Sequence, residues 1–207
     1  MIRPPGKDGV AFSERGDGDL REDPDSRELL ARALDVPAQW AWARQVHGAD
    51  LVRVEGPGNA GEFDALWTTI PGLPLAIFTA DCLGVVLKSD EAVGVAHAGW
   101  RGADAGVVPA LREAMTRAGH EPRFAAVGPG IGPCCFEVGP EVMQRFPSHG
   151  GETTWGTTSV DLAGVVMGQL DGLEIWSAGG CTRHDERFFS HRRDGTTQRM
   201  VSLGWLR

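Results

Sequence analysis

An apolar segment from Pro74 to Val86 does most to constrain what this chain of 207 residues can fold into. Continuous apolar runs of this kind are typical of buried strands. The longest of them, such as Leu73–Ala80, are far below the roughly 18 residues needed to cross a bilayer as a helix. Asp81 and Cys82 interrupt the run. We therefore expect a buried strand that breaks where a carboxylate and a thiol stand next to each other.

Strands and helices are expected to intermingle along the rest of the chain. Further strands are expected at Leu51–Val54, Ala65–Thr69, Ala92–Ala96, Phe124–Val127 and Leu173–Ser177. Helices are expected at Ser26–Leu34, Asp104–Ala118, Pro140–Phe146 and Val160–Leu170. A closing hairpin would have arms at Phe188–Arg193 and Gln198–Trp205 and a turn at Asp194-Gly195. Residues 1–25 are expected to be irregular, and the class is α/β or α+β in a single domain.

The charge balance argues against two classes of partner. The formal net charge is −8, and no block rich in Lys and Arg offsets it. Such a surface repels the phosphates of nucleic acids and anionic lipids, so we expect neither a nucleic acid nor a membrane as partner. Residues Met1 to Asp8 contain no apolar stretch typical of a secretion signal. We expect a cytoplasmic protein whose four cysteines are thiols or metal ligands.

Three residues stand at the kind of position where a strand opens onto a ligand. His47 closes a polar run that begins at Arg44, Cys82 lies at the break in the apolar segment, and His97 precedes a glycine turn. Two imidazoles and a thiolate suit zinc, and three protein ligands leave a fourth position for water or substrate. The intervals of 35 and 15 residues match no local zinc motif, so a shared site depends on the fold.

The same residues allow two other interpretations. Cys82 with His97 or His47 would form a nucleophile–base pair, with Asp81 orienting the imidazole. Alternatively, Cys82 is a small buried hydrophobic residue, as free cysteines commonly are, and both histidines are ordinary hydrogen-bonded side chains. Metal binding and nucleophilic attack both require a thiolate, so the sequence leaves these interpretations open.

A glycine-containing turn follows His97 at Gly99–Gly102. A turn of this kind that leads into a helix presents free N–H groups to an anion, and Arg101 adds a guanidinium that binds phosphate in a fork. A simple strand-to-helix turn capped by Asp104 is the alternative. The residues expected to contact substrate or phosphate are Arg44, Gln45, Gly99, Arg101 and Gly102.

Two further segments carry candidate residues. The loop Gly128–Glu137 is rich in glycine and proline and is expected to wall a pocket. Its adjacent Cys134 and Cys135 have a poor geometry for a mutual disulfide or for binding one metal together, so we interpret them as packing thiols. Cys181, at a strand end, either packs or lines the same cavity. The segment Phe188–Asp194 places two arginines by the expected hairpin turn, where a surface Arg–Asp pair is the simpler interpretation.

Several motifs along the chain resemble those of one family. They are Gln45–Gly48, Thr79–Cys82, His97–Gly102, Gly128–Pro133, Phe136–Gly139, Cys181-Thr182 and Phe188–Asp194. Taken in order, they are similar to the motifs of the bacterial laccase-domain family, whose members are also called polyphenol-oxidase-like proteins or peptidoglycan editing factors. The similarity runs from about residue 44 to residue 205, which is most of the chain.

The resemblance implies a fold, an activity and a set of site residues. The family has an α+β fold, a four-layer α/β/β/α sandwich, and its matching motifs bind one zinc ion, here through His47, Cys82 and His97. Members are purine nucleoside phosphorylases that act on adenosine, inosine, guanosine and methylthioadenosine, with adenosine deaminase activity as well. The expected catalytic residues are then Asp81, Cys82 and Arg101, with Arg101 near phosphate and Asp81 in proton transfer or in support of a metal ligand.

The chain departs from the family near its start and near its end. Other members carry Thr-Arg-x-Gly-Gly-Val-Ser and then an Asn-bearing stretch, which are reduced here to Phe12–Gly18, so residues 1–25 are shortened. The Cys-Thr-Tyr of many members reads Cys181-Thr182-Arg183. Six histidines without a His-x-His pair do not suit a multicopper cluster, which needs many imidazoles. We therefore expect zinc, with copper accepted only in vitro.

Two functions of other classes stay open beside the phosphorylase. A Cys–His hydrolase that edits cell-wall precursors is suggested by the editing-factor name, and a metal-binding protein without turnover is suggested by the shortened N-terminus. The expected partners are a purine nucleoside and phosphate, and the expected assembly is a monomer or homodimer.

Overall fold

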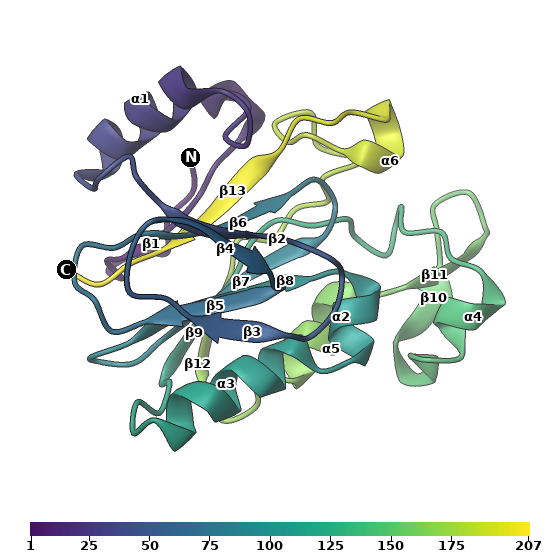
Figure 1. Ribbon diagram of the computed structural model, residues 1–207. Coiled ribbons are helices and arrows are strands. Elements are labelled where there is room, and N and C mark those ends of the chain that lie inside the picture. Colours follow the sequence, from purple (N-terminus) through teal and green to yellow (C-terminus); the bar gives the residue numbers. More distant parts are fainter.

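Two β-sheets lie face to face in the computed structural model, which describes residues 1–207, and helices cover both outer surfaces (Figure 1). The five-stranded sheet has the order β1 (Val10–Phe12), β13 (Met200–Gly204), β6 (Leu75–Thr79), β2 (Ala41–Arg44) and β4 (Gly58–Glu62). The six-stranded sheet has the order β12 (Glu174–Ser177), β9 (Phe124–Val127), β7 (Leu83–Lys88), β8 (Val93–Ala98), β5 (Ala65–Thr68) and β3 (Leu51–Arg53). Both sheets mix parallel and antiparallel pairs, and the expected α+β class is confirmed.

The apolar segment expected to form a broken strand supplies one strand to each sheet. Leu75 and Ile77 of β6 pack in the core between the sheets, together with Val86 of β7. Because β6 belongs to the five-stranded sheet and β7 to the six-stranded sheet, the break at Asp81 and Cys82 is the point where the chain crosses from one sheet to the other. The crossing places these two side chains at an end of the sandwich.

One outer layer is formed by α1 (Pro24–Leu34), which covers the five-stranded sheet (Figure 1). The side chain of Asp23 caps the first turn by accepting a backbone N–H, as is common at helix N-termini. Leu30 and Leu34 pack with Phe78 of β6 in a separate buried cluster. Alternate residues of β6 therefore serve two layers, because successive side chains of a strand point to opposite faces.

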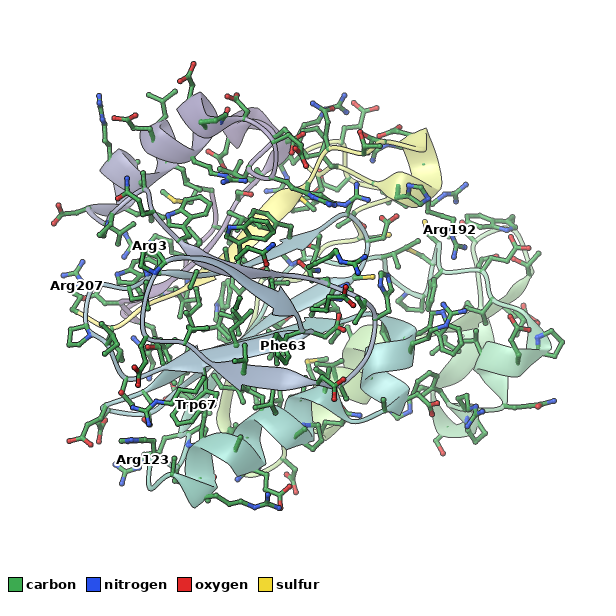
Figure 2. All side chains as sticks on the ribbon, in the orientation of Figure 1. Arg3, Phe63, Trp67, Arg123, Arg192 and Arg207 are labelled. Carbon is green, nitrogen blue, oxygen red and sulfur yellow. The ribbon has the colours of Figure 1, made fainter.

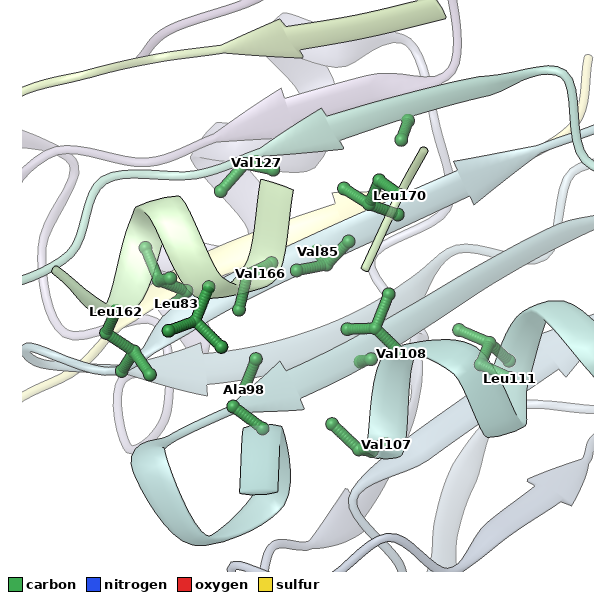
Figure 3. Packing of buried hydrophobic residues seen from close by; sticks show 14 of the residues in the cluster. Leu83, Val85, Ala98, Val107, Val108, Leu111, Val127, Leu162, Val166 and Leu170 are labelled. Carbon is green, nitrogen blue, oxygen red and sulfur yellow. The ribbon is translucent and has the colours of Figure 1, made fainter. Parts of the chain in front are cut away.

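The other outer layer covers the six-stranded sheet. It consists of α2 (Trp100–Asp104), α3 (Val107–Arg117) and α5 (Leu162–Gly168). Figure 3 shows Val108 and Leu111 of α3 and Val166 of α5 over Val85 of β7, all members of one buried cluster. The four layers thus follow the α/β/β/α order that the resemblance implied.

Short elements complete the chain at one end of the molecule (Figure 1). They are α4 (Pro140–Met143), β10 (Gly150–Glu152), β11 (Thr158–Val160) and α6 (His191–Asp194). None of the helices has both the length and the apolar character needed to cross a membrane.

Several expected helix bounds differ from the observed ones because capping residues lie elsewhere. The helix expected from Asp104 begins at Val107, since Gly106 adopts a φ of 79° and separates α3 from α2. Helix α5 begins after Asp161, whose side chain accepts the N–H of Gly164, and the residues before it form β11. Helix α4 ends at Met143, short of the expected bound.

The expected hairpin at the C-terminal end is wrong. Phe188 and Phe189 are apolar because they are buried beneath the end of the five-stranded sheet, in a cluster with Ala80 and Met200. Ser190 caps the short helix α6. The partners of β13 are β1 and β6. Strand β1 also corrects the expectation that residues 1–25 are entirely irregular.

Candidate active site

Three sequence-predicted residues converge where the two sheets meet. His47 follows β2, Cys82 lies at the crossing between β6 and β7, and His97 belongs to β8. Their ligand atoms all lie within 4.8 Å of one another, and the two imidazole rings meet edge to face with centroids 4.7 Å apart. We call these residues the His–Cys–His set. Its members come from both sheets, which is why no local spacing motif announced it.

Asp64, at the start of β5, orients this set and was not predicted. Its carboxylate is fully buried and lies 2.8 Å from Nδ1 of His97, so that the other ring nitrogen is left for a ligand. The backbone N–H groups of Val46, His47 and Gly48 donate to the same carboxylate at 3.2, 2.9 and 2.6 Å. These bonds hold His47 at a φ of 63°. The only sequence signal was a lone aspartate before a buried strand.

The environment of Cys82 favours the thiolate. Burial raises the pKa of this thiol, but hydrogen bonds to His47 and His97 and their charges outweigh burial and lower it to about 6. For His97, burial lowers the pKa, and the bonds to Asp64 and Cys82 raise it to about 9. The thiolate is the form that binds a metal and the form that attacks an electrophile.

Two glycines of the expected anion-binding turn instead make room for the set. A Cβ at Gly99 would lie 3.0 Å from Sγ of Cys82 and 3.5 Å from Cδ2 of His47. A Cβ at Gly102 would lie 3.0 and 3.1 Å from backbone carbonyl oxygens. Because α2 begins directly at Trp100 and spans only one turn, the expected open glycine turn before a long helix is wrong.

A cavity of about 630 Å³ opens beside the His–Cys–His set. Its aromatic lining residues are Trp42, Phe78, Trp100 and Phe136. Its arginines are Arg21, Arg44, Arg101, Arg192 and Arg199. Asp81 is the one carboxylate in the lining. A chain of net charge −8 therefore concentrates positive charge in its cavity, which favours an anionic ligand.

Three of these arginines have no carboxylate partner, and their charges are free for a ligand. Arg44 pairs with Glu62 and Arg21 with Glu22. The guanidinium carbon of Arg101, in contrast, lies 4.2 Å from the ring centroid of Trp100. The other two free cations are Arg192 and Arg199.

Arg192 comes from a part of the chain that sequence reasoning assigned to a surface hairpin. Figure 2 shows Arg192 between α6 and the segment that carries α4, β10 and β11. Its Nη1 donates to the carbonyl oxygen of Glu137 at 2.8 Å, and its side chain borders the cavity. Arg199, which directly precedes β13, could not be recognised from the sequence. It lies far along the chain from His47, Cys82 and His97, and only the fold brings it to the same cavity.

Gln45 and Asp81 line the cavity, but their side chains form hydrogen bonds within the protein that stabilise the fold. The amide of Gln45 donates to the carbonyl oxygen of Phe78 at 2.8 Å and accepts its N–H at 2.9 Å, which prolongs the pairing of β2 with β6. The carboxylate of Asp81 accepts the hydroxyl of Thr182 at 2.6 Å and the N–H of Arg192 at 2.7 Å. The carboxylate that orients an imidazole of the set is therefore Asp64, not Asp81.

Comparison with known proteins identifies the family. The family described as multi-copper polyphenol oxidoreductase laccase matches residues 16–207. The chain belongs to this laccase-like family. The resemblance noted in the sequence motifs is thereby confirmed.

Relatives in the laccase-like family carry the name purine nucleoside phosphorylase. The one from Streptomyces coelicolor is 40% identical over 197 residues, which cover 87% of this chain and 81% of the relative. YfiH of Escherichia coli is 36% identical over 199 residues, which cover 88% of this chain and 80% of the relative.

Solved structures share the fold of the laccase-like family. The Bacillus licheniformis hypothetical protein YfiH has a TM-score of 0.86 at 25% identity, covering 96% of this chain and 92% of that one. YlmD from Geobacillus stearothermophilus has a TM-score of 0.81 at 32% identity, covering 91% and 82%.

The laccase-like family is described as multi-copper, and a site for several copper ions would need a matching set of metal ligands. Two groups of three potential ligands occur, the His–Cys–His set and a group of three cysteines. Only two of the six histidines belong to either group. A cluster of several copper ions bound by many imidazoles therefore has no matching donor set in this chain.

Proposed function

We propose that this protein is a zinc-dependent purine nucleoside phosphorylase. One observation carries the proposal: a cavity with aromatic walls and five arginines opens beside the His–Cys–His set. A planar base, a ribose and a phosphate dianion together require this combination of aromatic and cationic surface. The names of the relatives in Streptomyces coelicolor and Escherichia coli support it.

The donor set fits zinc better than other common metals. Imidazole nitrogen and thiolate sulfur are the ligands that zinc prefers, whereas magnesium and calcium prefer oxygen. His47, Cys82 and His97 would hold the ion, with Asp64 fixing the ring of His97. When bound, zinc supplies a Lewis acid with one open position, which is typical of catalytic sites with three protein ligands.

The free arginines are the proposed phosphate-binding groups. Arg101, Arg192 and Arg199 border the cavity without a carboxylate partner. In phosphorolysis a phosphate oxygen forms a bond to C1′ of the ribose while the bond from C1′ to the purine nitrogen breaks. The base leaves with the bonding electron pair and takes up the proton that the attacking hydrogen phosphate gives up. Guanidinium groups hold the phosphate in position and stabilise the charge that moves from it.

The aromatic residues are the proposed base-binding groups. Trp42 and Phe78 meet edge to face with ring centroids 6.4 Å apart, and both line the cavity with Trp100 and Phe136. Flat apolar walls accept any purine, so adenosine, inosine, guanosine and methylthioadenosine are the proposed substrates. Asp81, whose carboxylate holds the backbone of Arg192, is proposed to position that arginine.

Deamination of adenosine is a second reaction proposed for the same cavity. It needs water rather than phosphate beside the base, and the aromatic walls adjoin the His–Cys–His set. A Cys–His hydrolase would use the same Cys82 thiolate without metal, since its low pKa of about 6 suits a nucleophile equally well.

The test separates these reactions by their products. Purified protein of known zinc content is incubated with adenosine, with and without phosphate, and the products are separated by chromatography. We expect adenine and ribose 1-phosphate only when phosphate is present, and both are lost in Cys82→Ala. Inosine formed without phosphate would demonstrate deamination.

Two outcomes would contradict the phosphorylase proposal. Zinc-loaded protein that releases no base from any of the four nucleosides would exclude it. Metal-free protein that is active on a cell-wall precursor and is inactivated by thiol alkylation would favour the hydrolase. Arg123→Ala is the control variant and should keep its activity, because Arg123 is exposed near the end of α3, far from Arg192 of the cavity (Figure 2).

A further inference from the structure

A second group of potential metal ligands lies outside the cavity lining. Cys134, Cys135 and Cys181 have their Sγ atoms within 4.8 Å of one another, and those of Cys134 and Cys135 are 3.5 Å apart. We call them the three-cysteine cluster. The sequence had suggested a poor geometry for the adjacent pair to bind one metal together, whereas the structure places their two sulfurs close to each other and to a third.

Local backbone structure explains the convergence. The N–H groups of Cys135 and Phe136 both donate to the carbonyl oxygen of Gly132 at 2.9 Å, and this tight turn brings the two neighbouring thiols together. A parallel β-bridge between Gly130 and Cys181 brings in the third cysteine from a distant segment. Neither feature is visible in the spacing of the cysteines.

The cluster has features that packing alone does not require. Sγ of Cys181 accepts the N–H of Gly132 at 3.2 Å. The turn that brings Cys134 and Cys135 together therefore also holds the Cys181 sulfur beside them, and the three donor atoms form one compact group.

We propose that the three-cysteine cluster is a second metal site, specific for a soft monovalent ion, Cu(I). Three sulfur donors with no imidazole or carboxylate among them select soft ions over magnesium, calcium or iron in an oxygen site. Structural zinc sites close with a fourth protein ligand, and this group offers three. Three thiolates around one ion is a coordination that Cu(I) accepts.

The position of the cluster makes such an ion accessible and relevant to the cavity. Cys134 and Cys181 are half-buried, whereas Cys135 is buried in the core. The same loop contributes Ile131 and Phe136 to the cavity lining. An ion at the cluster would therefore fix the loop that forms one cavity wall without contacting the substrate.

Cu(I) titration of the full chain tests the proposal. Reduced Cys82→Ser protein, in which the His–Cys–His set is disabled, is titrated without oxygen against a coloured Cu(I) chelator. We expect one equivalent of Cu(I) per chain and an X-ray absorption spectrum with only sulfur neighbours. Adding Cys181→Ser should abolish this equivalent. The same titration with Zn²⁺ should give no uptake at the cluster, and uptake of zinc in preference to Cu(I) would overturn the assignment.

A second measurement uses the unaltered protein, so that it does not depend on how the variants fold. Cu(I) bound at the cluster should protect Cys134, Cys135 and Cys181 from iodoacetamide, as read by peptide mass spectrometry. Equal alkylation of all three with and without Cu(I) would overturn the proposal. So would an uptake of Cu(I) that Cys181→Ser leaves unchanged.

Discussion

The His–Cys–His set and the three-cysteine cluster each bring a cysteine sulfur together with two further donors, yet their surroundings differ. The first set adjoins a cavity with free arginines, and a buried carboxylate orients one of its imidazoles. The second is held by backbone N–H groups in the core that supports the cavity wall. We infer from this comparison that similar donor atoms can serve different roles, because charged neighbours and open space lie beside only one of the two groups.

The largest effect is expected from removing the thiolate of the first set. Cys82→Ala should lower zinc affinity by more than about 100-fold, since partners of metal ligands alone contribute about 10- to 100-fold, and phosphorolysis should fall with it. Zinc content and kcat/KM for adenosine measure the two losses. Cys181→Ala is the comparison variant and should retain its zinc, because its sulfur belongs to the other cluster. If the two variants lose zinc equally, the distinction between the clusters fails.

The second largest effect is expected from removing the charge of Asp64, a carboxylate that has no counterpart in the three-cysteine cluster. Asp64→Asn retains the size of the side chain but removes the charge that fixes His97, so zinc affinity should fall by about 10- to 100-fold. Competition with a zinc chelator gives the value. Asp90→Asn, at a side chain that is 85% exposed, should leave it unchanged. An unaltered affinity in Asp64→Asn would show that the orienting bond is dispensable.

A smaller effect is expected from the free cations of the cavity. Arg101→Ala should raise the KM for phosphate by about tenfold, because a hydrogen bond to a charged group contributes about 1.5–3 kcal/mol and the cavity is open to water. Initial rates at varied phosphate provide the measurement, with Arg123→Ala as control. A change in the KM for adenosine with none for phosphate would assign this arginine to the nucleoside instead.

The smallest effect tests the space beside the thiol. Gly99→Ala would place a methyl group 3.0 Å from Sγ of Cys82, and we expect zinc affinity to fall by about threefold. The cost is below the roughly 1–3 kcal/mol of overpacking in a closed core, because this thiol borders a cavity. Gly168→Ala, where a methyl group meets no atom within 4 Å, should not alter zinc affinity. Equal behaviour of the two variants would show that the thiol moves freely.

Much of the fold could be predicted because buried strands carry their own signal. The continuous apolar run from Pro74 to Val86 favours buried strand, and β6 lies within it while β7 begins in it. Strand β4 could not be predicted, since Gly58–Glu62 is a polar, largely exposed edge. The expected hairpin failed because Phe188 and Phe189 are apolar for a reason of packing beneath the sheet rather than of strand formation.

The site was predictable only in part. His47, Cys82 and His97 could be proposed from their chemistry and from the family motifs, but their proximity depends on a chain that passes between two sheets. Asp64 could not be proposed, because its role exists only once the backbone around His47 folds onto it. The cationic character of the cavity was likewise hidden by a net charge of the opposite sign.

The crossing of the chain at Asp81 and Cys82 also has a mechanical consequence. His47 follows a strand of the five-stranded sheet, His97 belongs to the six-stranded sheet, and Cys82 lies on the connection between them. An ion bound by all three would link the two sheets at this end of the sandwich. For an ion that binds only the folded chain, a free concentration of 100 times its Kd adds about 2.7 kcal/mol to the free energy of unfolding. Heat resistance would then rise and fall with the zinc supply of the cell.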